Sequence, residues 1–144
     1  MLRILASVIV GYLVLLVCMF ALLTGAYLAM GTERAFQPGS YQVTLTWVVV
    51  SFVLSFAVAI VGGLVSRLVA RTQTGPRALA VVVLVLGFAM CAMIAMSPPP
   101  PADRPGDVPN MEAMQKAQTP LWVALLNPLV GAAGVLLGGR LKKP

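Results

Sequence analysis

Four sulfur-containing residues near position 90 form the group in this sequence best suited to hold a metal. They are Met90, Cys91, Met93 and Met96. Thioether and thiolate ligands select Cu(I), and side chains three residues apart share one face of a helix. The competing interpretation is structural, because methionine fills irregular gaps and an unpaired cysteine packs as a small apolar residue. We expect no resident metal or cofactor, and keep Cu(I) handling as the lesser alternative.

Asn127 and Pro128 are the second pair with chemical interest, because they lie inside an apolar run. Pro128 has no N–H to donate to the carbonyl of Ala124, so the pair predicts a kink and a free carbonyl. The Asn127 amide can bond across helices within a membrane. The structural interpretation is therefore a kink with an interhelical clamp. The functional alternative is a constriction in a small channel or passive transporter built from several copies.

Other chemistry is scarce in this chain of 144 residues, which has 60% hydrophobic side chains, 10% charged ones and no histidine. Such a composition cannot solvate a globular surface and is typical of a membrane protein. The acids, which catalysis or ion coupling would need, all lie outside the apolar runs: Glu33, Asp103, Asp107 and Glu112. We therefore expect neither an enzyme nor an ion-coupled transporter, and no nucleic-acid partner.

Four apolar runs are long enough to cross a bilayer as helices, which takes roughly 20 residues each. They cover residues 4–30, 43–66, 78–97 and 120–139. The first is about twice the length of a signal-peptide core, so we expect it to be retained. The fold predicted for 1–144 is a single membrane domain: an all-α integral membrane protein with four transmembrane helices in an antiparallel bundle.

The distribution of charge predicts the orientation of this bundle. The loop 67–77 and both termini hold cations and no acid: Arg3, Arg67, Arg71, Arg77, Arg140, Lys142 and Lys143. The loops 31–42 and 98–119 hold all four acids. Because cytoplasmic segments carry the excess of Lys and Arg, we expect both termini in the cytoplasm, beside anionic lipid. Usage rich in Ala, Val, Gly and Arg favours a bacterial inner membrane.

Two features are expected on the outer side. Four aromatic residues lie near the outer ends of the runs, where rings anchor helices at the headgroup level: Tyr27, Tyr41, Trp47 and Trp122. The loop 98–119 is long and opens with the proline run 98–101, which favours an extended polyproline spacer. Long loops often carry function, so this loop is the best candidate for contact with a partner.

Small residues recur along each apolar run at helical spacing, and small residues let membrane helices approach closely. The expected packing positions are Gly11, Gly25, Ser55, Ala59, Gly63, Gly87, Asn127, Gly131, Gly134 and Gly138. The leading functional hypothesis follows from these stripes and from the uncharged interior. It is a non-enzymatic structural or accessory subunit that packs against itself or against a larger membrane complex.

Overall fold

The computed structural model describes residues 1–98, 101, 103–106 and 108–141, and its elements are helices. Four of these helices are long and apolar enough to cross a membrane, as in a multi-pass membrane protein: α1 (Leu2–Met30), α3 (Leu45–Ala70), α4 (Thr74–Met96) and α6 (Leu121–Leu141). Two short helices, α2 (Thr32–Ala35) and α5 (Asn110–Gln115), lie in the connections. The prediction of four apolar helices is therefore confirmed.

The predicted loop 67–77 is wrong, because α3 continues to Ala70 and α4 already begins at Thr74. Arg67 does not end α3: it is only 8% exposed, so its charged end as well as its aliphatic stem is largely covered. Arg71 ends α3 instead, in a left-handed conformation with φ 59°. Pro76 is tolerated in the first turn of α4, where its missing N–H has no helical partner. The connection shortens to residues 71–73.

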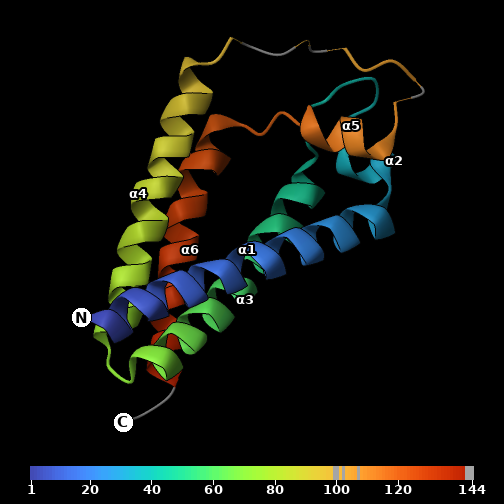
Figure 1. Ribbon diagram of the computed structural model, residues 1–144. Coiled ribbons are helices and arrows are strands. Elements are labelled where there is room, and N and C mark those ends of the chain that lie inside the picture. The colour runs from blue at the N-terminus through green and yellow to red at the C-terminus, as the bar shows by residue number, and fades with distance from the viewer. Residues whose placement is uncertain (99–100, 102, 107, 142–144) are drawn as a thin grey trace.

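The four long helices form two arms (Figure 1). One arm is α1 with α3 and the other is α4 with α6; the arms meet where α1 begins and α6 ends, and they diverge toward the opposite end. We call the meeting region the junction. It is defined by close contacts among Gly11, Gly62, Gly63, Gly75, Gly134, Gly138 and Gly139.

At the junction, glycines bring the backbones of α3 and α6 into direct contact. A Cβ atom built at Gly63 would overlap the carbonyl of Val135, and one at Gly138 would overlap the carbonyl of Ile60. Burying leucine gains little inside a membrane because lipid tails are equally apolar, so close backbone contact supplies the packing instead. The arms are therefore fixed at this end.

At the opposite end, two connections far apart in the sequence fold together. An antiparallel bridge between Phe36 and Val43 closes the first connection, and two further isolated bridges, Ser40–Asp103 (antiparallel) and Gln42–Gln118 (parallel), join it to the second. Their shared core consists of Tyr27, Ala35, Phe36, Tyr41, Val43, Val48, Ala113 and Val123. We call this unit, formed by residues 31–43 and the described part of 101–119, the cap. The predicted polyproline spacer includes residues 99–100, which lie outside the described residues.

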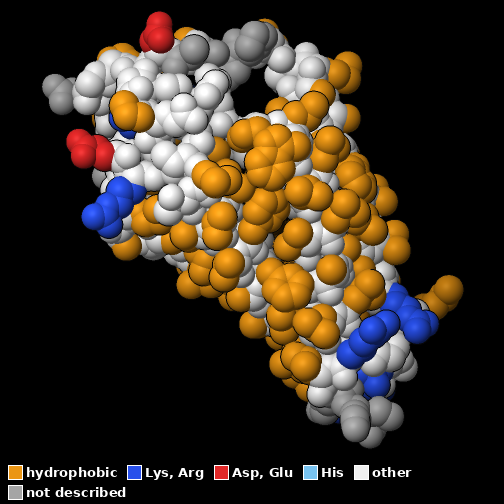
Figure 2. All heavy atoms as spheres, turned by 180° about the vertical axis from the view of Figure 1, so that it is seen from behind, with side chains coloured by type: hydrophobic (Ala, Val, Ile, Leu, Met, Phe, Trp, Pro, Cys, Tyr) orange, Lys and Arg blue, Asp and Glu red, His pale blue; other side chains and the backbone are white. Residues whose placement is uncertain are grey.

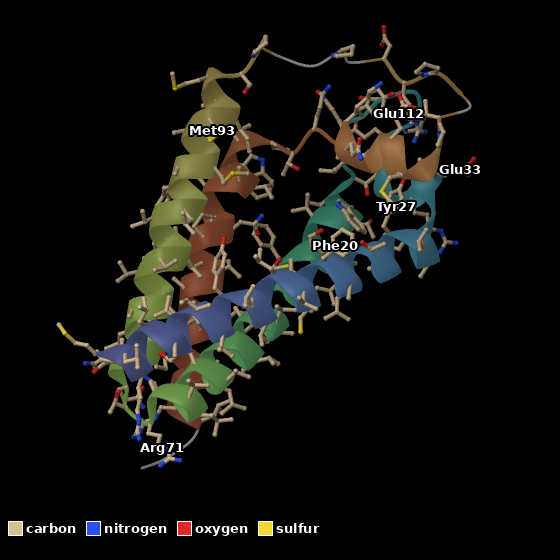
Figure 3. All side chains as sticks on the ribbon, viewed as in Figure 1. Phe20, Tyr27, Glu33, Arg71, Met93 and Glu112 are labelled. Atoms are coloured by element: carbon tan, nitrogen blue, oxygen red, sulfur yellow. The ribbon has the colours of Figure 1, made fainter. Side chains whose placement is uncertain are left out.

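Charged side chains separate between the two ends (Figures 2 and 3). The junction end carries Arg71 with the other cations of the helix ends there, Arg3, Arg67, Arg77 and Arg140. The cap carries Glu33 and Glu112 beside Arg34 and Lys116. The two remaining predicted topology residues, Lys142 and Lys143, lie outside the described residues. The charge pattern of the sequence thus becomes a polarity of the molecule along its long axis.

Candidate functional site

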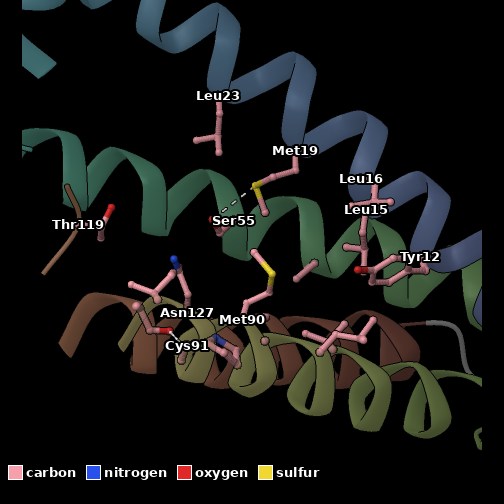
Figure 4. A pocket seen from close by; sticks show the side chains of 18 residues that line it. Tyr12, Leu15, Leu16, Met19, Leu23, Ser55, Met90, Cys91, Thr119 and Asn127 are labelled. Atoms are coloured by element: carbon pink, nitrogen blue, oxygen red, sulfur yellow. Dashed lines mark hydrogen bonds between the residues drawn. The ribbon is translucent and has the colours of Figure 1, made fainter. Parts of the chain in front are cut away.

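An apolar cleft of about 430 Å³ lies between the two arms (Figure 4). All four long helices contribute to its walls, and the α4 side runs from Val83 to Ile94. That stretch is about 17 Å long at 1.5 Å per residue. Most of the lining is aliphatic, and the polar or sulfur-containing side chains in it are Tyr12, Met19, Ser55, Met90, Cys91, Thr119 and Asn127. None of the residues that line the cleft is charged.

Pro128 organises one wall of the cleft. It lies inside α6 and is buried, and its ring occupies the space left by Gly87 on α4, where a built Cβ would lie 2.5 Å from Pro128 Cγ. The carbonyl of Ala124, to which a residue other than proline would donate its N–H, accepts from the thiol of Cys91 at 2.9 Å. Cys91 therefore supplies from α4 the donor that Pro128 withholds. α6 continues as one helix through Pro128.

Asn127 takes a position different from the predicted clamp. Its side chain points from α6 into the cleft (Figure 4), and the structure shows no hydrogen bond from it to any described residue. The side chain is exposed within the open cleft, so its donors and its acceptor are accessible to whatever fills that space. Asn127 is thus an unsatisfied polar group on the cleft wall.

The four predicted soft-metal ligands do not gather at one place. Met90 and Cys91 line the cleft, whereas Met93 and Met96 are 65% and 86% exposed and lie outside the lining. The sulfur that does face Met90 is that of Met19 on α1 (Figure 4), which also accepts a hydrogen bond from Ser55 Oγ at 3.6 Å. Sequence spacing could not reveal Met19, because it lies on a different helix. Among the described residues, no cluster of three or more His, Cys, Asp or Glu is placed to hold a metal ion.

The predicted packing residues divide between the two halves of the molecule. Ser55 and Ala59 are buried, Gly134 lies against Ala59, and Gly11 lies against Leu79 at the junction. Gly131 lies beside Val83 on the cleft wall. Gly25 departs from the expectation: it lies on an exposed face of α1, and a Cβ there would have no heavy atom within 4 Å. The small-residue stripe of α1 therefore contributes to helix contact only near the junction.

The predicted interface anchors also divide. Tyr27 and Tyr41 are each 2% exposed, so their rings belong to the core of the cap and do not face the surroundings as an anchor must. The Tyr27 ring meets those of Phe36 and Trp47 edge-on, with centroids 6.0 and 5.8 Å away. Trp47 is half-buried against this core, and only Trp122 is exposed.

The cap surface carries two cations over aromatic rings. The Arg104 guanidinium lies 5.6 Å from the Phe36 ring centroid, and Lys116 Nζ lies 5.8 Å from that of Tyr41. Lys116 also donates to Glu112 at 2.6 Å, and this hydrogen bond, with the charge of Glu112, raises the pKa of Lys116 above its ordinary value of 10.5. The sequence alone gave no signal for Phe36, because its role depends on contact between two distant loops.

The arrangement can hold an uncharged apolar molecule in the cleft and present a folded polar surface at the cap. Comparisons with protein-family models, with curated proteins and with solved structures each find no match to this chain. The function must therefore be argued from the geometry of these two regions.

Proposed function

We propose that this chain is a non-enzymatic accessory subunit of a bacterial inner-membrane assembly, and that the cap is its contact surface. In this proposal the four long helices cross the membrane as an antiparallel bundle with both termini in the cytoplasm. The partner is another membrane protein subunit or a second copy of the chain.

The observation that carries the proposal is that the cap has its own hydrophobic core. A connection that only joins two helices does not need to bury Phe36, Tyr41 and Ala113 almost completely. Ordering these loops costs conformational entropy of about 1–2 kcal/mol per residue. An ordered surface outside the membrane would offset this cost when a partner binds. A surface that is already ordered loses less conformational entropy on binding than a flexible loop does.

The charge polarity of the molecule supports the orientation. Five described cations lie at the junction end, where the sequence has no acid, while the cap mixes both signs (Figure 2). The excess of Lys and Arg on short segments follows the cytoplasmic side. The exposed cations at the junction, such as Arg71 and Arg140, would then lie beside anionic headgroups.

The geometry favours this proposal over a channel within one chain. The contact of α3 with α6 at Gly63 and Gly138 lies below the cleft, on the junction side, so the cleft does not continue to that end. A channel would have to form between copies, and Asn127 would then have to face the central axis of the oligomer.

The test is the intact mass of the assembly after gentle solubilisation, for wild type and two charge-reversal variants. Arg34→Glu changes an exposed side chain on the cap, and Arg77→Glu is the matched change on an exposed side chain at the junction end. We expect the wild type and Arg77→Glu to retain a partner or second copy, and Arg34→Glu to lose most of it. A wild-type chain that is monomeric, or equal retention by both variants, would contradict the proposal.

A further inference from the structure

Three polar side chains of the cleft wall, Tyr12, Thr119 and Asn127, make no hydrogen bond to a described residue, and Asn127 lies between the other two along the cleft (Figure 4). Asn127 lies six residues after Leu121, where α6 begins, which places it about 9 Å along the helix from the cap-side end. Its amide carries two donors and one acceptor. Two further polar positions of the cleft wall are engaged, since Cys91 donates to Ala124 and Ser55 donates to Met19. The cleft is therefore complementary to an apolar molecule with one polar group near Asn127.

The dimensions of the cleft select a narrow occupant. The centre of a water-sized molecule can occupy about 430 Å³ over about 17 Å, a mean cross-section of about 25 Å², and a radius of about 1.4 Å on each side gives a free width of roughly 8 Å. A helix with its side chains is about 10–12 Å across. A transmembrane helix of a partner therefore does not fit, whereas a single hydrocarbon chain does.

The charge and the depth of the site restrict the polar group of the occupant. No charged side chain lines the cleft, so an ionised group there would be left without a partner. A phospholipid carries its ester groups at the boundary of the hydrocarbon region, and Asn127 lies well below the start of α6. The cleft extends toward the cap to Thr119, which is exposed.

We propose that the cleft is a binding site for a neutral lipophile with one hydrocarbon chain and a carbonyl group, which enters beneath the cap. The Asn127 amide donates to that carbonyl. The chain extends from there toward Tyr12, between Met19 and Met90, whose unbranched side chains adapt to irregular shapes. The site lies within one chain, so it does not depend on the partner contact proposed for the cap.

The experiment uses two probes that share a ring and a chain, 2-decyl-1,4-benzoquinone and decylbenzene. Each is added to the purified full chain in mild detergent, and the bound molecules per chain are counted by native mass spectrometry. A membrane hydrogen bond of about 0.6–1.7 kcal/mol corresponds to roughly three- to fifteenfold tighter binding of the quinone by the wild type. Asn127→Leu keeps the number and branching of the side-chain heavy atoms and removes that preference.

Leu23 and Leu22 provide the matched pair that locates the site. Leu23 points into the cleft, whereas Leu22 is exposed on the adjoining face and lies outside the lining. Leu23→Trp lowers quinone binding at least tenfold, and Leu22→Trp leaves it unchanged. Equal binding of the two probes by the wild type would overturn the proposal, and so would equal quinone binding by the two tryptophan variants. A chain that binds one quinone in this way but purifies without a partner would contradict only the accessory role.

Discussion

The long helices pack differently in the two halves of the molecule, closely at the junction and loosely toward the cap. At the junction, glycine leaves no side chain at the points where α3 and α6 come closest, and the backbones touch at Gly63 and Gly138. Toward the cap the arms separate, and the space between them is a cleft lined by flexible side chains such as Met19 and Met90. The comparison indicates that close helix packing at the junction stabilises the fold. The cap-side half can therefore contain a ligand cleft and a folded surface.

The largest loss of stability is expected for a substitution at the junction, where the backbones of α3 and α6 are in direct contact. Gly63→Val places a side chain on the carbonyl of Val135, which is backbone and cannot move aside. We expect a loss of more than about 4 kcal/mol in the free energy of unfolding, or no folded protein at all. Unfolding in a series of SDS–detergent mixtures, followed by circular dichroism, measures it.

The control for this variant lies in the open half. A Cβ at Gly25 meets nothing within 4 Å, so Gly25→Ala is expected to stabilise α1 by about 0.5–1 kcal/mol. A Gly25→Ala variant as unstable as Gly63→Val would show that α1 is in close contact along its whole length, and would remove the contrast between the halves.

The second effect is expected in the cap. Phe36 is 2% exposed and contacts Tyr27 and Arg104, so Phe36→Ala is expected to lose about 3 kcal/mol of local stability. Hydrogen exchange should rise in residues 31–43 and 110–119 and stay unchanged in the junction segments of α3 and α6. Equal loss of protection at the junction would mean that the two halves unfold as one unit.

A smaller effect is expected on the cleft wall. Cys91→Ala leaves the carbonyl of Ala124 without a donor and is expected to cost about 1 kcal/mol of unfolding free energy. Cys91→Ser keeps a donor at this place and is expected to restore most of the loss. The same SDS titration compares the two variants, and equal instability of both would assign the effect of Cys91 to volume alone.

The smallest effect concerns the exposed pair Lys116–Glu112. Glu112→Gln weakens the hydrogen bond to Lys116 and removes the charge of Glu112, which together raise the pKa of Lys116, so this pKa should fall toward 10.5. A raised pKa in the folded state stabilises the cap below pH 10.5 and loses this effect as the pH rises through the folded-state pKa. Titration of the Lys116 ¹³Cε NMR shift measures the change, and an unchanged pKa would show that the pair does not form in solution.

The sequence predicted the four helices because an apolar run of 20 or more residues is a strong local signal. It misplaced the ends of α3 and α4, because a cation normally ends an apolar run and the packing of Arg67 depends on tertiary contacts. The position of Pro128 was sufficient to predict that the carbonyl of Ala124 has no N–H donor within α6, because this depends on spacing within one helix. Its donor, Cys91, and the face-to-face pair Met19 and Met90 arise from contacts between helices, which spacing along one chain does not encode.

The cap illustrates the same limit over a greater distance. Tyr27 and Tyr41 have the positions of interface anchors in the sequence, but Tyr27 is buried against Phe36 and Trp47, and Tyr41 is buried where two loops more than 60 residues apart meet. The stripe of small residues likewise identified the surfaces of α3 and α6 that could pack. It did not distinguish Gly63 from Gly25, because both continue a stripe of small residues at helical spacing.

The most direct test of the contrast between the halves is a pair of spin-label distances in lipid nanodiscs. One pair joins α1 to α4 near the cap, at Leu28 and Met93, and the other joins them near the junction, at Leu5 and Val81; all four side chains are exposed. Double electron–electron resonance should give a longer and broader distance for the pair near the cap than for the pair near the junction. Equal distances would show a parallel-sided bundle and contradict the account.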